Sequence, residues 1–264
     1  MWGKLIVGAC GYLLGGPVGL LIGIFIGHQI DNSMVRAGIY PGGVGGVSHS
    51  ETQRAFFEAT FSVMGCMAKA DGRVSEEEIS LAREIMTRMG LPEDSRREAI
   101  NLFTLGKAPD FPLEETLSRF RAVSHQAHNL RQMFIEIQLH AAYADSDLNP
   151  SEKKLLLQIC SVLGFSPLDL ERLDAMVRAE HHASKGGRDG RVDQVSDVDA
   201  YAILNITSNV SDAEVKRAYR RLMNQHHPDK LVAKGLPREM MKLAEEKTHE
   251  IRVAYERIRK SRGF

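Results

Sequence analysis

A basic helix that has to stop at a proline constrains the C-terminal quarter of this chain more than any other feature. The helix begins where the Ser211 hydroxyl and the Glu214 carboxylate can cap its first free amides. Pro228 cannot continue a helix and disfavours the helical conformation at His227, so the chain must turn there. We therefore expect His227, Pro228 and Asp229 in the last turn of this helix, at the tip of a two-helix hairpin.

Apolar residues on both sides of the turn predict the two helices of the hairpin. Apolar side chains that recur every three or four residues mark one buried face of a helix. Before the turn they are Val215, Ala218, Tyr219 and Leu222, and after it Leu243, Ala244, Ile251, Ala254, Tyr255 and Ile258. A shorter helix upstream places Tyr201 and Leu204 on one face.

The order of helices, turn and tripeptide resembles the J domain, through which DnaJ-type co-chaperones act on Hsp70. The resemblance covers residues 197–264. It implies that His227, Pro228 and Asp229 trigger the Hsp70 switch. It also implies an Hsp70-docking face made of Lys216, Tyr219, Arg220 and Arg221. The spacing of Tyr219 suits core packing as well, so its role stays open.

The charge of the chain is divided between two regions of opposite sign. Residues 197–264 contain 14 Lys and Arg against 10 Asp and Glu, whereas residues 37–196 contain 18 against 23. A cationic hairpin suits an acidic groove on a protein partner. A plain solvated helix and a nucleic-acid site are the alternatives. Because aromatic residues are not interleaved with the basic ones, we predict no nucleic-acid partner.

Residues 1–30 are predicted to form a membrane anchor. Residues 5–26 contain no charged side chain, and about 20 apolar residues are enough for a helix to cross a bilayer. A cleaved signal peptide is the alternative. Lys4 is the only side-chain cation before the apolar run, and the polar boundary after it lacks a small-x-small cleavage site. A retained anchor is therefore favoured.

Glycines recur at a fixed interval within the predicted anchor. Small residues four apart let membrane helices approach closely and associate. The five positions are Gly11, Gly15, Gly19, Gly23 and Gly27. The spacing predicts a homodimer through this face, although glycine is also common in membrane helices generally.

The orientation of the anchor depends on the resemblance, because flanking charges are too few to decide it. Hsp70 partners of a J domain are cytosolic, so the residues after the anchor are expected in the cytosol. The three cysteines, Cys10, Cys66 and Cys160, have no spacing that suggests a disulfide framework.

Two glycine-rich breaks separate the remaining parts of the chain. Residues 31–50 predict a flexible tether, and residues 181–196 predict a second flexible linker. Both linkers would let the J-like segment move freely near the membrane. Residues 51–180 lie between them and are expected to form a single all-α domain.

An internal repeat with an offset of 74 residues organises this middle domain. The offset carries the acidic turn at Asp71 onto the one at Asp145, and Gly90 onto Gly164. In each copy a helix is predicted to start after the turn, at Ser75 with Glu78 or at Asn149 with Pro150 and Glu152. Each new helix is expected to end at its glycine. The turns and the helix order resemble the TerB-like domain, named for tellurite-resistance proteins.

The acidic turns raise the question of a calcium site. Asp145, Asp147 and Asn149 open like an EF-hand loop, but its sixth position is Pro150 and its twelfth is Leu156. Helix capping is the favoured interpretation. The pairs His125 with His128 and Glu136 with His140 have helical spacing but no further ligands nearby. We interpret them as ordinary surface or core residues and predict no metal site.

Enzymatic function is not expected. The sequence contains no Ser-His-Asp order, no phosphate-binding glycine loop after a strand and no catalytic carboxylate pair. We therefore predict no catalytic residue and no cofactor. The fold class is all-α throughout: one transmembrane helix, a helical middle domain with an internal two-fold repeat, and a C-terminal helical hairpin.

Anchor, TerB-like domain and J domain in this order resemble the DjlA family, membrane-anchored DnaJ-like co-chaperones of Gram-negative bacteria. The resemblance implies a single-span inner-membrane protein with a short periplasmic amino end. It also implies stimulation of the Hsp70 DnaK and a link to envelope-stress signalling that controls capsule synthesis. No Gly/Phe-rich segment or zinc repeat is present, so client choice is expected to fall to the TerB-like domain. The alternative is a tethered scaffold without Hsp70 activity.

Overall fold

The computed structural model describes residues 48–70, 83, 86–87, 89–143, 148–186 and 195–264. They belong to one compact unit, Val47–Phe264. Within these residues every regular element is a helix, and none of these helices has both the length and the apolar character needed to cross a bilayer. The predicted anchor, its glycine repeat and residues 31–47 of the first linker lie outside the described residues. The last two residues of that linker, His49 and Ser50, belong to the first described helix, His49–Ala68.

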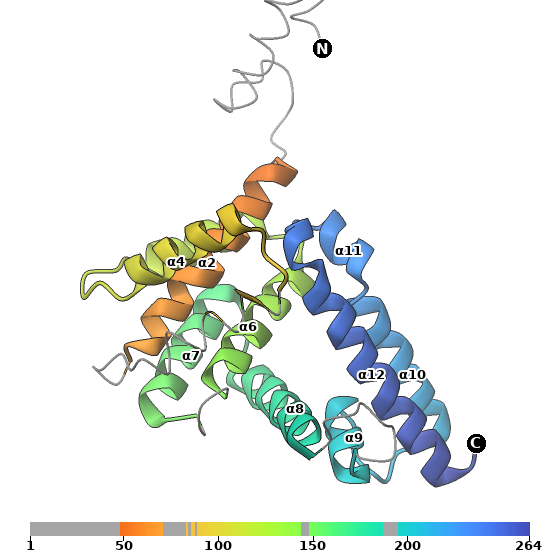
Figure 1. The fold of residues 1–264 in the computed structure, drawn as a ribbon. Helices are drawn as coiled ribbons and strands as arrows, with labels where there is room; N and C mark the ends of the chain where they lie inside the picture. Colours follow the sequence, from red (N-terminus) through yellow and green to blue (C-terminus); the bar gives the residue numbers. More distant parts are fainter. Residues whose placement is uncertain (1–47, 71–82, 84–85, 88, 144–147, 187–194) are drawn as a thin grey trace, which may run out of the picture. The chain divides into compact units, whose positions relative to one another are not determined.

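The middle region consists of helices that share one apolar core, and α2 (His49–Ala68) and α6 (His128–Ala142) carry many of its buried residues (Figure 1). Three phenylalanines from α2, α5 and α6 meet in its core, with the ring centroids of Phe56 and Phe120 5.7 Å apart and those of Phe120 and Phe134 5.2 Å apart. The described helices are α2 (His49–Ala68), α4 (Glu93–Gly106), α5 (Leu113–Val123), α6 (His128–Ala142), α7 (Pro150–Leu163) and α8 (Pro167–Gly186).

The described part of the internal repeat confirms its predicted helix boundaries. Helices α2 and α6 end at Ala68 and Ala142, positions that the 74-residue offset superimposes. Asn149 caps α7 through a complete capping box with Glu152. Gly90 and Gly164 both have positive φ angles, 69° and 82°, which suits a glycine at a helix end. The box predicted at Ser75 falls outside the described residues.

The C-terminal region is a hairpin of two helices, α10 (Asp212–Gln225) and α12 (Met241–Arg262), preceded by the short α9 (Asp197–Ile203) (Figure 1). The capping box of Ser211 and Glu214 is present as predicted. Apolar residues from all three helices form a core of their own, which includes Ala200, Ile203, Val215, Leu222, Ile251, Ala254 and Ile258. Tyr219 stacks on Tyr255, with ring centroids 4.2 Å apart.

The turn of the hairpin is more ordered than the sequence predicts. His227, Pro228 and Asp229 do not form the last turn of α10; they begin a separate short helix, α11 (Pro228–Ala233). The 3-10 helix η2 (Arg238–Met240) follows and leads into α12. The proline therefore acts twice, because it ends α10 and also occupies the first position of α11.

The expectation of a freely moving C-terminal segment is wrong. Helix α8 continues through Gly186, so the first six residues of the predicted linker 181–196 are helical. Residues at the hairpin tip join the apolar core of the middle helices, namely Leu231, Leu236, Met240 and Ala244. Ala179 of α8 in turn joins the core of the hairpin. This mutual burial of apolar side chains holds the two regions together.

Candidate functional site

The tripeptide stands at the start of α11 with its polar side chains in solvent. His227 is the N-cap residue and has extended backbone angles, φ −59° and ψ 123°, as its following proline predicts. His227 and Asp229 are exposed, and Pro228 is half-buried. The Lys230 ammonium donates a hydrogen bond to the Asn224 side chain, which ties the first turn of α11 to the end of α10.

The predicted docking face on α10 separates into two kinds of residue. Lys216, Arg220 and Arg221 are exposed and present cationic groups to solvent. Tyr219 is only half-buried, but its ring packs on Tyr255 of α12. The three basic residues are thus available to a partner, whereas the tyrosine ring also holds the hairpin together.

The residues immediately before the tripeptide are bound by α6 of the middle region. Asn129 donates a side-chain hydrogen bond to the Gln225 carbonyl, with 3.3 Å between the atoms. The Gln225 side chain donates to Gln132, also at 3.3 Å. His226 is 1% exposed. The end of α10 is therefore enclosed where the chain enters the tripeptide.

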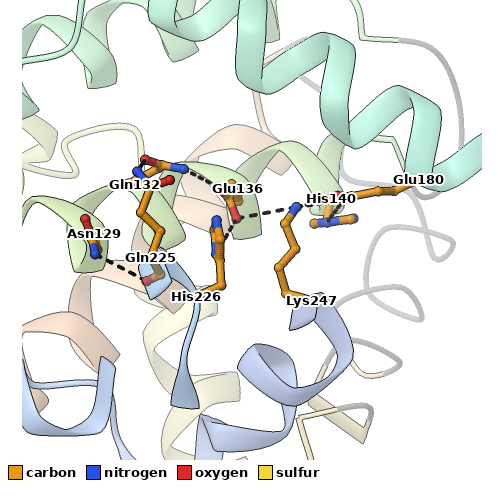
Figure 2. Close-up of polar contacts among 8 residues, drawn as sticks. All are labelled: Asn129, Gln132, Glu136, His140, Glu180, Gln225, His226 and Lys247. Atoms are coloured by element: carbon orange, nitrogen blue, oxygen red, sulfur yellow. Dashed lines mark hydrogen bonds and ion pairs between the residues drawn. The ribbon is translucent and has the colours of Figure 1, made fainter. Parts of the chain in front are cut away.

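A cluster of buried charged side chains lies beside His226 (Figure 2). We call Glu136 of α6, Glu180 of α8, His226 and Lys247 of α12 the tip cluster; each is at most 4% exposed. The Lys247 ammonium donates to both Glu180 carboxylate oxygens, at 2.6 and 2.8 Å, and lies 3.5 Å from Glu136 Oε2. His226 Nδ1 lies 3.6 Å from the same Glu136 oxygen.

Two polar neighbours complete the surroundings of the carboxylates. Gln132 donates to Glu136 Oε1 at 2.8 Å. His140, which is partly exposed, places Nε2 3.3 Å from Glu180 Oε2. A cavity of about 50 Å³ adjoins Glu136 and Lys247, which is large enough to admit a water molecule.

The ionisation of the tip cluster follows from its contacts. Burial opposes ionisation of Glu180, but the Lys247 charge and the His140 hydrogen bond outweigh it, so the pKa of Glu180 is lowered. Burial also opposes the charge of Lys247, yet Glu136 and Glu180 hold its pKa above the usual value. For His226 burial dominates over the attraction of Glu136 and lowers the pKa. Burial therefore favours the uncharged form of the His226 imidazole, and the Lys247 ammonium lies between the side chains of Glu136 and Glu180.

The chain after the tripeptide is bound by α2. Gln53 donates a side-chain hydrogen bond to the Leu236 carbonyl at 3.3 Å. Gly235 has a φ angle of 111°, and a Cβ atom there would lie 2.4 Å from the Thr52 methyl carbon. Only glycine satisfies both the backbone conformation and this close approach. The middle region thus contacts the hairpin tip on both sides of the tripeptide.

Sequence reasoning missed the tip cluster. It treated Glu136 and His140 as ordinary residues, and it did not single out Glu180, His226 or Lys247. One signal was available, because Lys247 lies in the apolar stripe of α12 between Ala244 and Ile251. In the part of the chain that the structure describes, no three His, Cys, Asp or Glu side chains are placed to hold a metal ion. The acidic turn at Asp145 lies outside that part.

Three regions of the chain each match the model of a different protein family. The profile of the tellurite resistance protein TerB matches residues 57–175, and that of the DnaJ domain matches residues 199–262. A third profile, the co-chaperone DjlA transmembrane domain, matches residues 1–46.

Relatives named co-chaperone protein DjlA align with the whole chain. The protein from Photobacterium profundum is 46% identical and that from Coxiella burnetii 45%; the alignments cover 100% and 99% of this chain, and 100% and 98% of the relatives. The Vibrio cholerae protein is 44% identical, over 100% of this chain and 99% of its own. No solved structure matches the chain.

Proposed function

Because the chain belongs to the DjlA family of membrane-anchored co-chaperones, we propose that it stimulates ATP hydrolysis by the Hsp70 DnaK. The observation that carries the proposal is the intact His227-Pro228-Asp229 tripeptide, held at the tip of the α10–α12 hairpin with both polar side chains in solvent. The match of the DnaJ domain to residues 199–262 supports an Hsp70 as the partner.

We assign the docking surface to the tripeptide and to Lys216, Tyr219, Arg220 and Arg221 of α10. Lys216, Arg220 and Arg221 attract an acidic groove and orient the hairpin, while His227 and Asp229 make the contacts that act on the ATPase. The mechanism is allosteric, since docking can change the hydrolysis rate only by favouring the hydrolysis-competent state of DnaK. Catalysis takes place in the partner.

The test is single-turnover ATP hydrolysis by DnaK with the full chain reconstituted in lipid nanodiscs. Stimulation that increases with the concentration of the chain and saturates supports the proposal. A rate equal to that of DnaK alone would contradict it and leave a membrane scaffold that acts through the TerB-like domain.

The proposal also includes the topology. Residues 1–30 span the inner membrane once with a short periplasmic amino end, and residues 31–50 tether the middle domain to them. The TerB-like domain, residues 51–180, selects a client or signalling partner, and the J domain extends over residues 197–264.

The proposal that the protein takes part in envelope-stress and capsule signalling rests on the family resemblance alone.

Replacing Gly15 and Gly19 together by Leu is expected to abolish homodimerisation of the anchor while leaving membrane insertion intact. Two bulky side chains would fill the groove through which the helices approach. A membrane-association reporter measures the effect. The matched control is Leu14→Ala with Leu21→Ala, because a helix of 3.6 residues per turn places those positions on the side away from the centre of the glycine face. A dimer signal unchanged in the glycine variant would show that another surface joins the chains.

A further inference from the structure

We propose that the TerB-like domain positions the tripeptide for DnaK, and that the tip cluster of Glu136, Glu180, His226 and Lys247 is the lock that holds it. The inference rests on the proposed function, because it assigns these four side chains to the same reaction. They are positioning residues: they act by holding His226 and helix α12 against the middle helices, and they do not touch the partner.

The first support is the pattern of burial around the tripeptide. His226 immediately precedes it and is 1% exposed, and Leu231 closely follows it and is also 1% exposed. Between them His227 and Asp229 are exposed. The docked arrangement therefore fixes both ends of a four-residue segment and leaves its polar side chains free to meet a partner.

The second support is that the hairpin tip lacks an apolar core of its own. Val215, Leu222 and Ile251 pack within the hairpin, and Leu222 and Ile251 are the buried residues of this core nearest the tip. At the tip, Leu231, Leu236 and Met240 are buried instead in the core of the middle helices. The order of the segment that follows the tripeptide therefore depends on contact with the TerB-like domain.

The third support is the energetic character of the tip cluster. Glu136 and Glu180 come from the middle helices, whereas His226 and Lys247 come from the hairpin, so separation of the two regions would return all four groups to water. A buried ion pair gains little over well-packed apolar residues, but removal of one partner leaves an uncompensated buried charge. The docked arrangement should therefore be sensitive to the loss of Lys247 alone and tolerant of an apolar replacement of the whole set of ions.

Positioning has a specific functional consequence. A segment that is already ordered loses less conformational freedom when it binds a partner. Opening the tip cluster leaves the side chains of the tripeptide unchanged, so the docked complex with DnaK remains competent. We expect a higher concentration of the chain at half-maximal stimulation, with little change in the maximal rate.

The experiment compares four forms of the full chain in nanodiscs: wild type, Lys247→Met, Lys242→Met, and the triple variant Glu136→Met, Glu180→Met, Lys247→Met. Lys242 is an exposed lysine of the same helix and serves as the matched control. Hydrogen exchange of the amides of residues 225–240 reports on docking of the tip. Single-turnover hydrolysis by DnaK over a range of chain concentrations reports on function.

For Lys247→Met we expect faster exchange at the tip and a half-stimulating concentration higher by roughly fivefold, about the cost of ordering one or two more side chains. The maximal rate should be retained. The triple variant should return both quantities towards the wild type, and Lys242→Met should change neither.

Other outcomes overturn the inference. Unchanged exchange in Lys247→Met would show that the tip cluster does not hold the tip. Faster exchange with an unchanged half-stimulating concentration would remove the positioning role, and stronger stimulation would mean that docking restrains the J domain. The wild type could fail to stimulate DnaK while exchange at the tip still responds to Lys247→Met. The proposed function would then be wrong, and only the structural role of the tip cluster in holding the hairpin tip would be supported.

Discussion

Replacing Asp229 by Asn is expected to reduce stimulation of DnaK by roughly 100-fold. The substitution keeps the shape of the side chain and removes its charge. Loss of one partner from a desolvated, hydrogen-bonded charge pair at an interface weakens binding by about 2–5 kcal/mol. A loss of roughly 2.7 kcal/mol of binding free energy corresponds to a 100-fold lower affinity. The measurement is single-turnover ATP hydrolysis by DnaK at chain concentrations well below saturation, where the stimulated rate follows the affinity of docking.

Folding should be unaffected, because Asp229 is exposed and exposed substitutions usually change the free energy of unfolding by less than about 0.5 kcal/mol. His227→Gln tests the neighbouring position in the same way. The control is Glu245→Gln, which makes the same change of charge at an exposed site on α12. If Asp229→Asn stimulated DnaK as strongly as the control, the J-domain mechanism would be excluded for this chain.

The parts of the fold that could be predicted from the sequence are those determined by neighbouring residues. Ser211 and Glu214 lie three positions apart and cap the same turn, so their pairing is visible in the sequence and is present in the structure. Asn149 and Glu152 also lie three positions apart, and they form the same kind of capping box in the structure. Gly164 ends α7 in a left-handed conformation for reasons confined to its own backbone.

Helix α11 could not be predicted in this way. Pro228 correctly predicts that α10 ends and that His227 is extended, yet six residues are too few for a helical period to be recognised. Such a short helix is also marginal by itself in water. It forms here because Leu231 is buried among the middle helices, about 100 residues away in sequence from some of its neighbours in that core, such as Leu130.

Dependence on contacts between residues distant in sequence also explains why the tip cluster could not be predicted. Exposure of the basic residues on α10 follows from the period of that helix. In contrast, Glu136, Glu180 and Lys247 meet only because three helices distant in sequence pack together, and no local pattern records which partner each will have. The glycine-rich composition of residues 181–196 indicated flexibility, but it contained no information on the contacts of the segment after it.

The contact between α2 and α4 provides the largest expected effect on stability. The two helices approach so closely that a Cβ atom on Gly106 would lie 1.8 Å from the Ser62 carbonyl oxygen. A Cβ atom on Gly65 would lie 2.0 Å from the Phe103 carbonyl oxygen. Both obstacles are backbone atoms, so neither can be relieved by rotating a side chain. Each glycine thus permits the approach of the other helix.

Gly106→Ala is therefore expected to lower the free energy of unfolding by about 3 kcal/mol. Two effects compete at this position. Alanine favours a helix over glycine by about 1 kcal/mol, while forced separation of packed elements costs about 1–3 kcal/mol and occasionally more. With backbone atoms in the way, separation of α2 and α4 should dominate, and Gly65→Ala should behave alike for the same reason.

Thermal unfolding of the full chain in nanodiscs, followed by circular dichroism, measures the effect. About 3 kcal/mol corresponds to a decrease of roughly 6–12 °C in the melting temperature of a domain of this size. Asn101→Ala is the control, because Asn101 is an exposed residue of the same helix and should gain a few tenths of a kcal/mol from helix propensity. A Gly106→Ala protein that melts at or above the temperature of this control would show that α2 and α4 can separate at little cost, and that the close crossing is not required for stability.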